Sequence, residues 1–331
     1  MAAPSLDVVG IGNAMVDVLA QTDDAFLVAQ GLTKGTTALI DAQAAEALYA
    51  QMGAGIEMSG GSAGNTVAGI ASLGGRGAYI GKVRDDALGR VFAHDLHALG
   101  VRYETPAASD GAATARCLIL VTPDAQRTMN TFLGACVALA PEDIDPALIG
   151  AAQVTYLEGY LFDPPQAKTA FRRAAELAHA AGRKVALSLS DPFCVGRHRA
   201  DFRALVERHI DILFANEAEI GSLYETEDFA AAAGAVRGQC EIAVLTRSAE
   251  GSVIVTQDET HKVAAAPVAR VVDTTGAGDL YAAGFLFGLT HGRDLAACGR
   301  LGSLCAAEII SHFGARPETR LKELAARAGL M

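Results

Sequence analysis

The pattern of apolar and polar positions predicts short strands that alternate with helices over most of the chain. Short apolar runs typical of buried strands occur at 6–11, 78–83, 154–157, 185–189, 210–214, 242–246 and 251–256. Helical spacing of apolar residues covers 41–52, 86–99, 165–181 and 202–208. Short strands alternating with helices of this length indicate an α/β fold with a doubly wound, mostly parallel sheet.

A different pattern interrupts this alternation in two places. Residues 114–121 and 127–133 read as the two strands of a hairpin, and strand-like segments also lie at 16–20 and 36–40. We therefore expect a small β-sheet built from two insertions, at about 14–42 and 104–134, within one domain that spans 1–331. A layer of this kind over the ends of a parallel sheet would act as a lid.

The most informative stretch runs from Asp273 to Asp279, where a polar, glycine-rich turn opens into an apolar helix. The unpaired N–H groups of the first turn and the helix dipole form a site for anions. Gly276 and Gly278 let the backbone approach a ligand closely. Asp279 either caps these N–H groups or acts as a base beside them. A base next to such donors is what phosphoryl transfer to an alcohol requires.

Polar residues near the N-terminus mark a second candidate region. Asn13 and Asp17 leave the end of the first strand, where ligands bind in α/β sheets. The alternative is turn chemistry for Asn13 and a solvated strand face for Asp17. The glycine-rich loop at 59–71 contains Asn65 and lacks the lysine of a phosphate-binding loop, so it suits a hydroxyl-rich ligand better.

Two further strand ends carry polar groups. Asn216 and Glu219 follow one strand, and their amide and carboxylate either position Mg²⁺ or its waters, or form a capping box. Their spacing alone does not choose between these interpretations. The turn at 246–252 follows another strand, and it either lies along a nucleotide or forms a simple hairpin.

Composition narrows the classes of partner. The chain has 331 residues and a formal net charge of -11, without a basic stripe, which argues against nucleic acid. Its six cysteines are scattered without a paired motif, so we expect reduced thiols. No run approaches the roughly 18 apolar residues of a membrane span, and the N-terminus lacks a basic leader. We expect a soluble, cytoplasmic protein with no membrane partner.

A dinucleotide-binding interpretation of Gly10-Ile11-Gly12 is weaker. The third glycine of that fingerprint is absent, and residues 16–20 alternate like a strand where the fingerprint needs a helix. A dehydrogenase is therefore disfavoured.

With these pieces in order, the chain resembles the ribokinase-like (PfkB) family of carbohydrate and nucleoside kinases over essentially its full length. The loop with Gly60, Gly61 and Asn65 is similar to the family's first signature, and residues 273–279 are similar to its second, which is highly specific. The pair Asn216 and Glu219 is similar to the family's Mg²⁺-organising motif. Within the family, residues 12–17, 187–193 and 211–219 most resemble adenosine kinases.

The resemblance implies roles for the residues at matching positions. Asp279 would be the base, and the anion hole would be formed by Gly276, Ala277 and Gly278. Sugar hydroxyls would be bound by Asp17, Gly60, Gly61 and Asn65, with Asn13 beside them. ATP would be lined by Thr246, Arg247 and Gly251, together with Asn216 and the glycines of the anion hole.

The resemblance also implies cofactors and two further contacts. Asn216 and Glu219 would order Mg²⁺ through water, and Asp273 and Thr275 match positions that bind a monovalent cation such as K⁺ in related enzymes. On the hairpin, Arg127 is a candidate for reaching the transferred phosphate. An aromatic residue that stacks on the base is expected from the lid or near residue 160, where Tyr160 is the candidate.

The function implied is ATP-dependent phosphorylation of a primary hydroxyl, with the 5′-hydroxyl of adenosine as the first choice. The alternative within the family is a sugar kinase acting on ribose, fructose or a relative. A non-catalytic nucleoside or sugar sensor is a third possibility, against which Asp279 argues because a sensor needs no base. Exposed lid strands would either pair between two subunits or be capped within a monomer.

Overall fold

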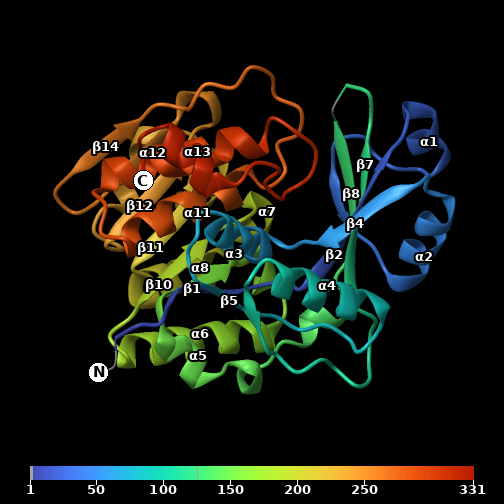
Figure 1. Cartoon of the computed structure of the whole chain (residues 1–331), viewed down its shortest axis with the longest axis horizontal. Coiled ribbons are helices and arrows are strands. Elements are labelled where there is room, and N and C mark those ends of the chain that lie inside the picture. The colour runs from blue at the N-terminus through green and yellow to red at the C-terminus, as the bar shows by residue number, and fades with distance from the viewer. Residues whose placement is uncertain (1–2, 125) are drawn as a thin grey trace.

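The computed structural model describes residues 3–124 and 126–331, which form a large and a small β-sheet (Figure 1). Residues 1 and 2 of the predicted domain, and residue 125 in the predicted hairpin turn, lie outside the described residues. Within those described ranges, no helix is both long and apolar enough to cross a membrane.

The large sheet confirms the predicted α/β fold. Its nine strands follow the order β14-β13-β12-β11-β10-β9-β1-β5-β6. Along this order, every neighbouring pair from β6 to β12 is parallel. The pairs β12–β13 and β13–β14 are antiparallel. The bounds are β1 Leu6–Ile11, β5 Gly77–Ile80, β6 Arg102–Tyr103, β9 Ala152–Glu158, β10 Lys184–Ser188, β11 Ile212–Asn216, β12 Ile242–Thr246, β13 Ser252–Val255 and β14 Thr260–Val263.

The central strands are mostly apolar because helices cover both faces of the sheet. Along β1, Val9 and Ile11 join the core on one face and Val8 joins the core on the other. The first core lies under α5 (Pro146–Ala151), α6 (Pro165–Ala180), α7 (Pro192–Arg197), α8 (Arg199–His209), α9 (Glu217–Tyr224) and α10 (Phe229–Val236). The second lies under α3 (Ser62–Ser72), α4 (Ala87–Ala98), α11 (Ala277–Thr290), α12 (Leu295–Ile309) and α13 (Leu321–Arg327).

The small sheet lies beside this three-layer body (Figure 1). Its strand order is β3-β8-β7-β2-β4, with bounds β2 Met15–Gln21, β3 Thr37–Leu39, β4 Gly55–Ser59, β7 Ala115–Val121 and β8 Arg127–Phe132. Helices α1 (Asp24–Ala29) and α2 (Ala42–Gln51) cover its outer face. The hairpin β7–β8 and strands β2 and β3 match the predicted segments, whereas β4 lies outside the ranges 14–42 and 104–134.

Helices α3 and α11 pack unusually closely at Gly69. A Cβ at this position would lie 2.6 Å from Leu280 Cδ1 and 2.7 Å from Ala283 Cβ, both on α11. These distances are shorter than real Cβ contacts, so only glycine allows this spacing of the two helices. The close packing brings the beginnings of α3 and α11 side by side.

We expect Gly69→Ala to lower the free energy of unfolding by about 1–3 kcal/mol, because the added methyl group must push α3 away from α11. Chemical denaturation measures this change. Gly234→Ala is the matched control: Gly234 lies within α10 and a Cβ there would meet nothing within 4 Å, so it should stabilise by about 0.5–1 kcal/mol. Equal stability of the two variants would contradict the packing argument.

Candidate active site

Asp279 lies in the first turn of α11 and is held by two residues of α3. Ser62 Oγ donates a hydrogen bond to Asp279 Oδ1 at 2.6 Å, and Asn65 Nδ2 donates to Oδ2 at 2.8 Å. Burial raises the pKa of the Asp279 carboxyl above its ordinary value, while these two hydrogen bonds and the charge of Arg316 partly offset the rise. Asp279 is therefore a fixed carboxylate with more basic character than one on the surface.

The backbone before Asp279 has the form of an anion site. Gly276 caps α11 with a left-handed φ of 75°, which favours glycine. The N–H groups of the first turn have no helical carbonyl to donate to. A Cβ at Gly278 would meet no atom within 4 Å, so the space beside these donors is open. Gly276, Ala277 and Gly278 thus fit a phosphoryl group next to the Asp279 carboxylate.

Asp17 is a buried acceptor without a partner. Its side chain is 6% exposed, and none of the described residues donates a hydrogen bond to its carboxylate. A Cβ at Gly60 would overlap this carboxylate, which explains the glycine there. Burial raises the pKa of Asp17 to about 7, with a smaller increase from Asp279, and the charges of Arg316 and Arg127 oppose the rise. A buried carboxylate of this kind requires donors, and a vicinal diol supplies two.

Asn13 directs its amide to the carboxylate of Glu158, which belongs to none of the sequence motifs. Asn13 Nδ2 donates to Glu158 Oε1 at 2.8 Å, and the Ala63 N–H donates to Glu158 Oε2 at 2.8 Å. Burial raises the pKa of Glu158 to about 7. Gly61 has a φ of 83°, and a Cβ there would overlap the carbonyl oxygen of Asn13. The only sequence signal for Glu158 was its position at the end of a core strand.

Arg127 connects the small sheet to the loop before α11. Its Nε lies 2.8 Å from Asp273 Oδ1, its Nη2 donates to Thr274 Oγ1 at 3.1 Å, and its Nη1 contacts Thr275 Oγ1. The structure thus brings Arg127, on strand β8 of the small sheet, into contact with the loop of the anion site.

The same contacts bear on the expected monovalent cation. Asp273 Oδ1 accepts from the Thr275 N–H at 2.9 Å and from its hydroxyl at 2.6 Å, besides its ion pair with Arg127. Asp273 Oδ2 accepts from the Gly314 N–H at 3.0 Å. Oδ1 is fully engaged and a guanidinium already supplies positive charge there, which disfavours K⁺ at the Asp273 carboxylate. The cation site at Asp273 and Thr275 stays a prediction.

A cavity of about 820 Å³ lies at the carboxyl ends of β11 and β12. Its lining includes the predicted nucleotide residues Asn216, Thr246 and Arg247, and Phe229, whose ring lies 4.2 Å from the Arg247 guanidinium carbon. Gly251 is not among the lining residues. It has a φ of 84° and accepts from the Arg247 N–H at 2.8 Å, so it closes the turn that carries Arg247.

Asn216 and Glu219 form the capping box that their spacing allowed. Asn216 Oδ1 accepts from the Glu219 N–H at 2.9 Å, and Glu219 Oε2 accepts from the Asn216 N–H at 2.9 Å. Burial raises the pKa of Glu219 to about 7. The described residues contain no cluster of three or more His, Cys, Asp or Glu side chains arranged for a metal. The pair therefore fits water-mediated contact with Mg²⁺ better than direct coordination.

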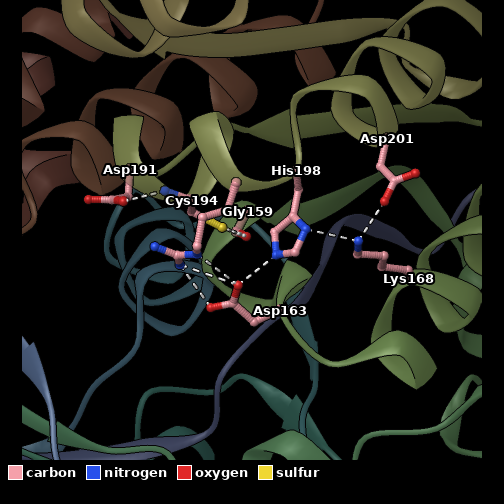
Figure 2. A network of polar contacts seen from close by, with 8 residues as sticks. Gly159, Asp163, Lys168, Asp191, Cys194, His198 and Asp201 are labelled. Carbon is pink, nitrogen blue, oxygen red and sulfur yellow. Dashed lines mark hydrogen bonds and ion pairs between the residues drawn. The ribbon is translucent and has the colours of Figure 1, made fainter.

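Tyr160 lies on the short helical segment η3 (Gly159–Phe162) and is 42% exposed. Figure 2 shows the polar network that anchors this segment. Asp163 binds His198 Nε2 at 2.7 Å, and Lys168 Nζ lies 3.1 Å from His198 Nδ1. Because the lysine donates to Nδ1, Nε2 carries the proton that His198 donates to Asp163. The Cys194 thiol contacts the Gly159 carbonyl at 3.5 Å, which further fixes the backbone beside Tyr160.

Comparison with known proteins agrees with this geometry. Residues 35–320 match the family model described as pfkB family carbohydrate kinase. The chain belongs to this family. It is therefore a phosphotransferase with an alcohol group as acceptor, in a family that uses ATP and typically Mg²⁺.

Individual relatives narrow the resemblance within the family. The crystal structure of an adenosine kinase from Sinorhizobium meliloti is 52% identical, with a TM-score of 0.93 over 98% of this chain and 99% of that one. A probable sugar kinase protein from Rhizobium etli CFN 42 is 49% identical, with a TM-score of 0.95 over 99% and 100%. The adenosine kinase of Saccharomyces cerevisiae is 27% identical over 95% of this chain and 96% of its own length.

We expect activity to change by less than about twofold when K⁺ is replaced by tetramethylammonium at constant ionic strength, because Arg127 already provides the positive charge at Asp273. Steady-state rates in the two salts test this. Arg127→Met, which removes the guanidinium from Asp273 Oδ1, should lower the rate and make it rise with added K⁺. Strong activation of the unaltered enzyme by K⁺ would contradict the expectation.

Proposed function

We propose that this kinase transfers the γ-phosphoryl group of ATP to the 5′-hydroxyl of adenosine, giving AMP. The observation that carries the proposal is the position of Asp279, a carboxylate beside the first-turn N–H groups of α11 and near the unpartnered Asp17. An acceptor whose diol binds Asp17 would direct its primary hydroxyl toward Asp279.

In this proposal Asp279 accepts the proton of the attacking hydroxyl as the O–P bond forms. The N–H groups of Gly276, Ala277 and Gly278 stabilise the charge on the transferred phosphoryl oxygens. Arg127 adds positive charge from the small sheet, and it keeps the loop before α11 in place through Asp273 and Thr275. Closure of the small sheet over the acceptor excludes water and so protects ATP from hydrolysis.

ATP would occupy the cavity lined by Asn216, Thr246 and Arg247, with its phosphates extending toward α11. Mg²⁺, when bound, neutralises charge on the phosphates. Glu219 would orient its water ligands from the capping box, and a cation nearby would favour the ionised form of this buried carboxyl.

Adenosine is preferred to a free sugar because of the 52% identical adenosine kinase and because Tyr160, which interacts electrostatically with Asp279 and Glu219, is partly exposed. The second candidate is a sugar kinase, which the resemblance to a probable sugar kinase at 49% identity favours. The two candidates share the base and the anion hole, and they differ in whether the acceptor pocket binds a purine.

We expect Asp279→Asn to lower turnover by about 10²–10⁴-fold, because the hydroxyl proton then has no acceptor, while ATP binding is retained. Turnover and nucleotide titration measure the two effects separately. Glu323→Gln, at an exposed acid in the first turn of α13, is the matched control and should behave as the unaltered enzyme. Near-normal turnover by Asp279→Asn would overturn the base assignment.

A panel of adenosine, inosine, guanosine, ribose and fructose with Mg·ATP tests the acceptor. Release of ADP should be fastest with adenosine at low acceptor concentration, because both the ribose diol and the adenine ring of adenosine contribute to binding. Turnover confined to the free sugars would replace the nucleoside assignment with the sugar kinase alternative. The Tyr160→Ala variant should raise the KM for adenosine more than that for ribose.

A further inference from the structure

Arg316 is an arginine of the candidate site that no sequence motif identified. It lies between α12 and α13, close to the beginning of α3. Arg316 Nη1 donates to Asn65 Oδ1 at 2.6 Å, and Nη2 donates to Ser59 Oγ at 3.0 Å. A Cβ at Gly64 would lie 3.7 Å from Arg316 Nη2, so the guanidinium packs directly on the backbone of α3.

The contact with Asn65 fixes the direction of its amide. Oδ1 accepts from Arg316, so Nδ2 is the atom that faces Asp279 and donates to Oδ2 at 2.8 Å. In the opposite orientation the amide oxygen would face a carboxylate, and its NH₂ group would face a guanidinium. Both contacts would then be repulsive. Arg316 therefore allows only the orientation in which Asn65 supports Asp279.

We propose that Arg316 is a positioning residue for phosphoryl transfer, which locks the Asn65 amide as a donor to Asp279 and places a positive charge beside the carboxylates of Asp279 and Asp17. This inference rests on the proposed role of Asp279 as the base. Arg316, in the C-terminal segment of the chain, would then influence Asp279 in two ways: through the orientation of Asn65 and through the electric field of its guanidinium.

The charges around the site support this role. Burial lowers the pKa of Arg316, and the carboxylates of Asp17, Asp279 and Asp95 oppose that change. In turn, the charge of Arg316 lowers the pKa values of Asp17 and Asp279. The other titratable or charged groups that interact with these two carboxylates come from several elements: Arg127 on β8, Cys117 on β7, Tyr156 and Glu158 on β9, Tyr160 on η3 and Glu219 on α9.

Lysine is not equivalent to arginine at this position. The planar guanidinium reaches Asn65 and Ser59 with two separate nitrogens, whereas a lysine ammonium is a single compact donor group. Arg316→Lys therefore keeps the charge and loses part of the fixed geometry. Arg316→Met removes the charge and both donors while it keeps much of the apolar bulk. The two variants separate the electric field from the orientation of Asn65.

The experiment is single-turnover phosphoryl transfer at saturating Mg·ATP and acceptor, followed from about pH 5 to pH 9. The acceptor is whichever of adenosine, inosine, guanosine, ribose or fructose turns over best, so the result does not depend on the acceptor's identity. Arg320→Met, at a nearby exposed arginine, is the matched control. Thermal melting of each variant reports whether it is folded.

Removal of the positive charge raises the pKa of Asp279, so a higher pH is needed to ionise the base. We therefore expect Arg316→Met to move the acidic limb of the rate profile upward by about 1 pH unit. Arg316→Lys should leave that limb in place but lower the plateau rate. On the high-pH plateau, Arg316→Met should lower the transfer rate by a much smaller factor in an Asn65→Ala background than in the unaltered enzyme, since the two residues act together.

An acidic limb that does not move in Arg316→Met would overturn the inference, even if melting temperature or rate falls, because a purely structural residue gives that result. The inference also fails if the double variant's plateau rate falls by the product of the two single-variant losses in rate. The two residues would then act independently. The Asp279→Asn variant in the same assay keeps the two proposals apart. If it is active, the base assignment fails; if it is inactive while Arg316→Met shows an unchanged profile, only the role of Arg316 fails.

Discussion

The hydrogen bonds from Ser62 and Asn65 to Asp279 join the beginnings of two helices that are more than 200 positions apart in the chain. The junction requires α3 and α11 to pack within the distance that Gly69 permits. Because Asp279 belongs to α11 and its carboxylate is held by α3, the carboxylate stands beside the first-turn N–H groups of α11 in one geometry. The acceptor side and the phosphate side of the site are thereby fixed relative to each other.

Charge compensation is the second constraint on the site. Burial raises the pKa values of Asp17, Glu158 and Asp279, so these carboxyls need hydrogen-bond donors or positive charge to remain ionised. Arg316 supplies positive charge from the C-terminal segment and Arg127 supplies it from the small sheet. Since Arg127 belongs to a strand of the small sheet, the charge at the loop before α11 depends on where that sheet lies.

The sequence was sufficient for the fold because apolar runs buried on both faces identify parallel strands, and β1 and β12 have the predicted bounds. It also predicted the turn at Gly276 and the helix whose first turn carries Asp279, since a glycine-rich turn before an apolar helix is a local signal. Strand β4 was missed because its first three residues are exposed and its apolar content is low. Arg316 was missed because its role depends on tertiary contacts with Asn65 and Ser59, and no local spacing encodes them.

The most direct measurement is a crystal structure with adenosine and a non-hydrolysable ATP analogue bound together. The account predicts the adenosine 5′-oxygen within hydrogen-bond distance of an Asp279 carboxylate oxygen and the ribose diol on Asp17. It also predicts the γ-phosphate analogue at the N–H groups of Gly276, Ala277 and Gly278. A 5′-oxygen directed away from Asp279, with another carboxylate beside it, would contradict the account.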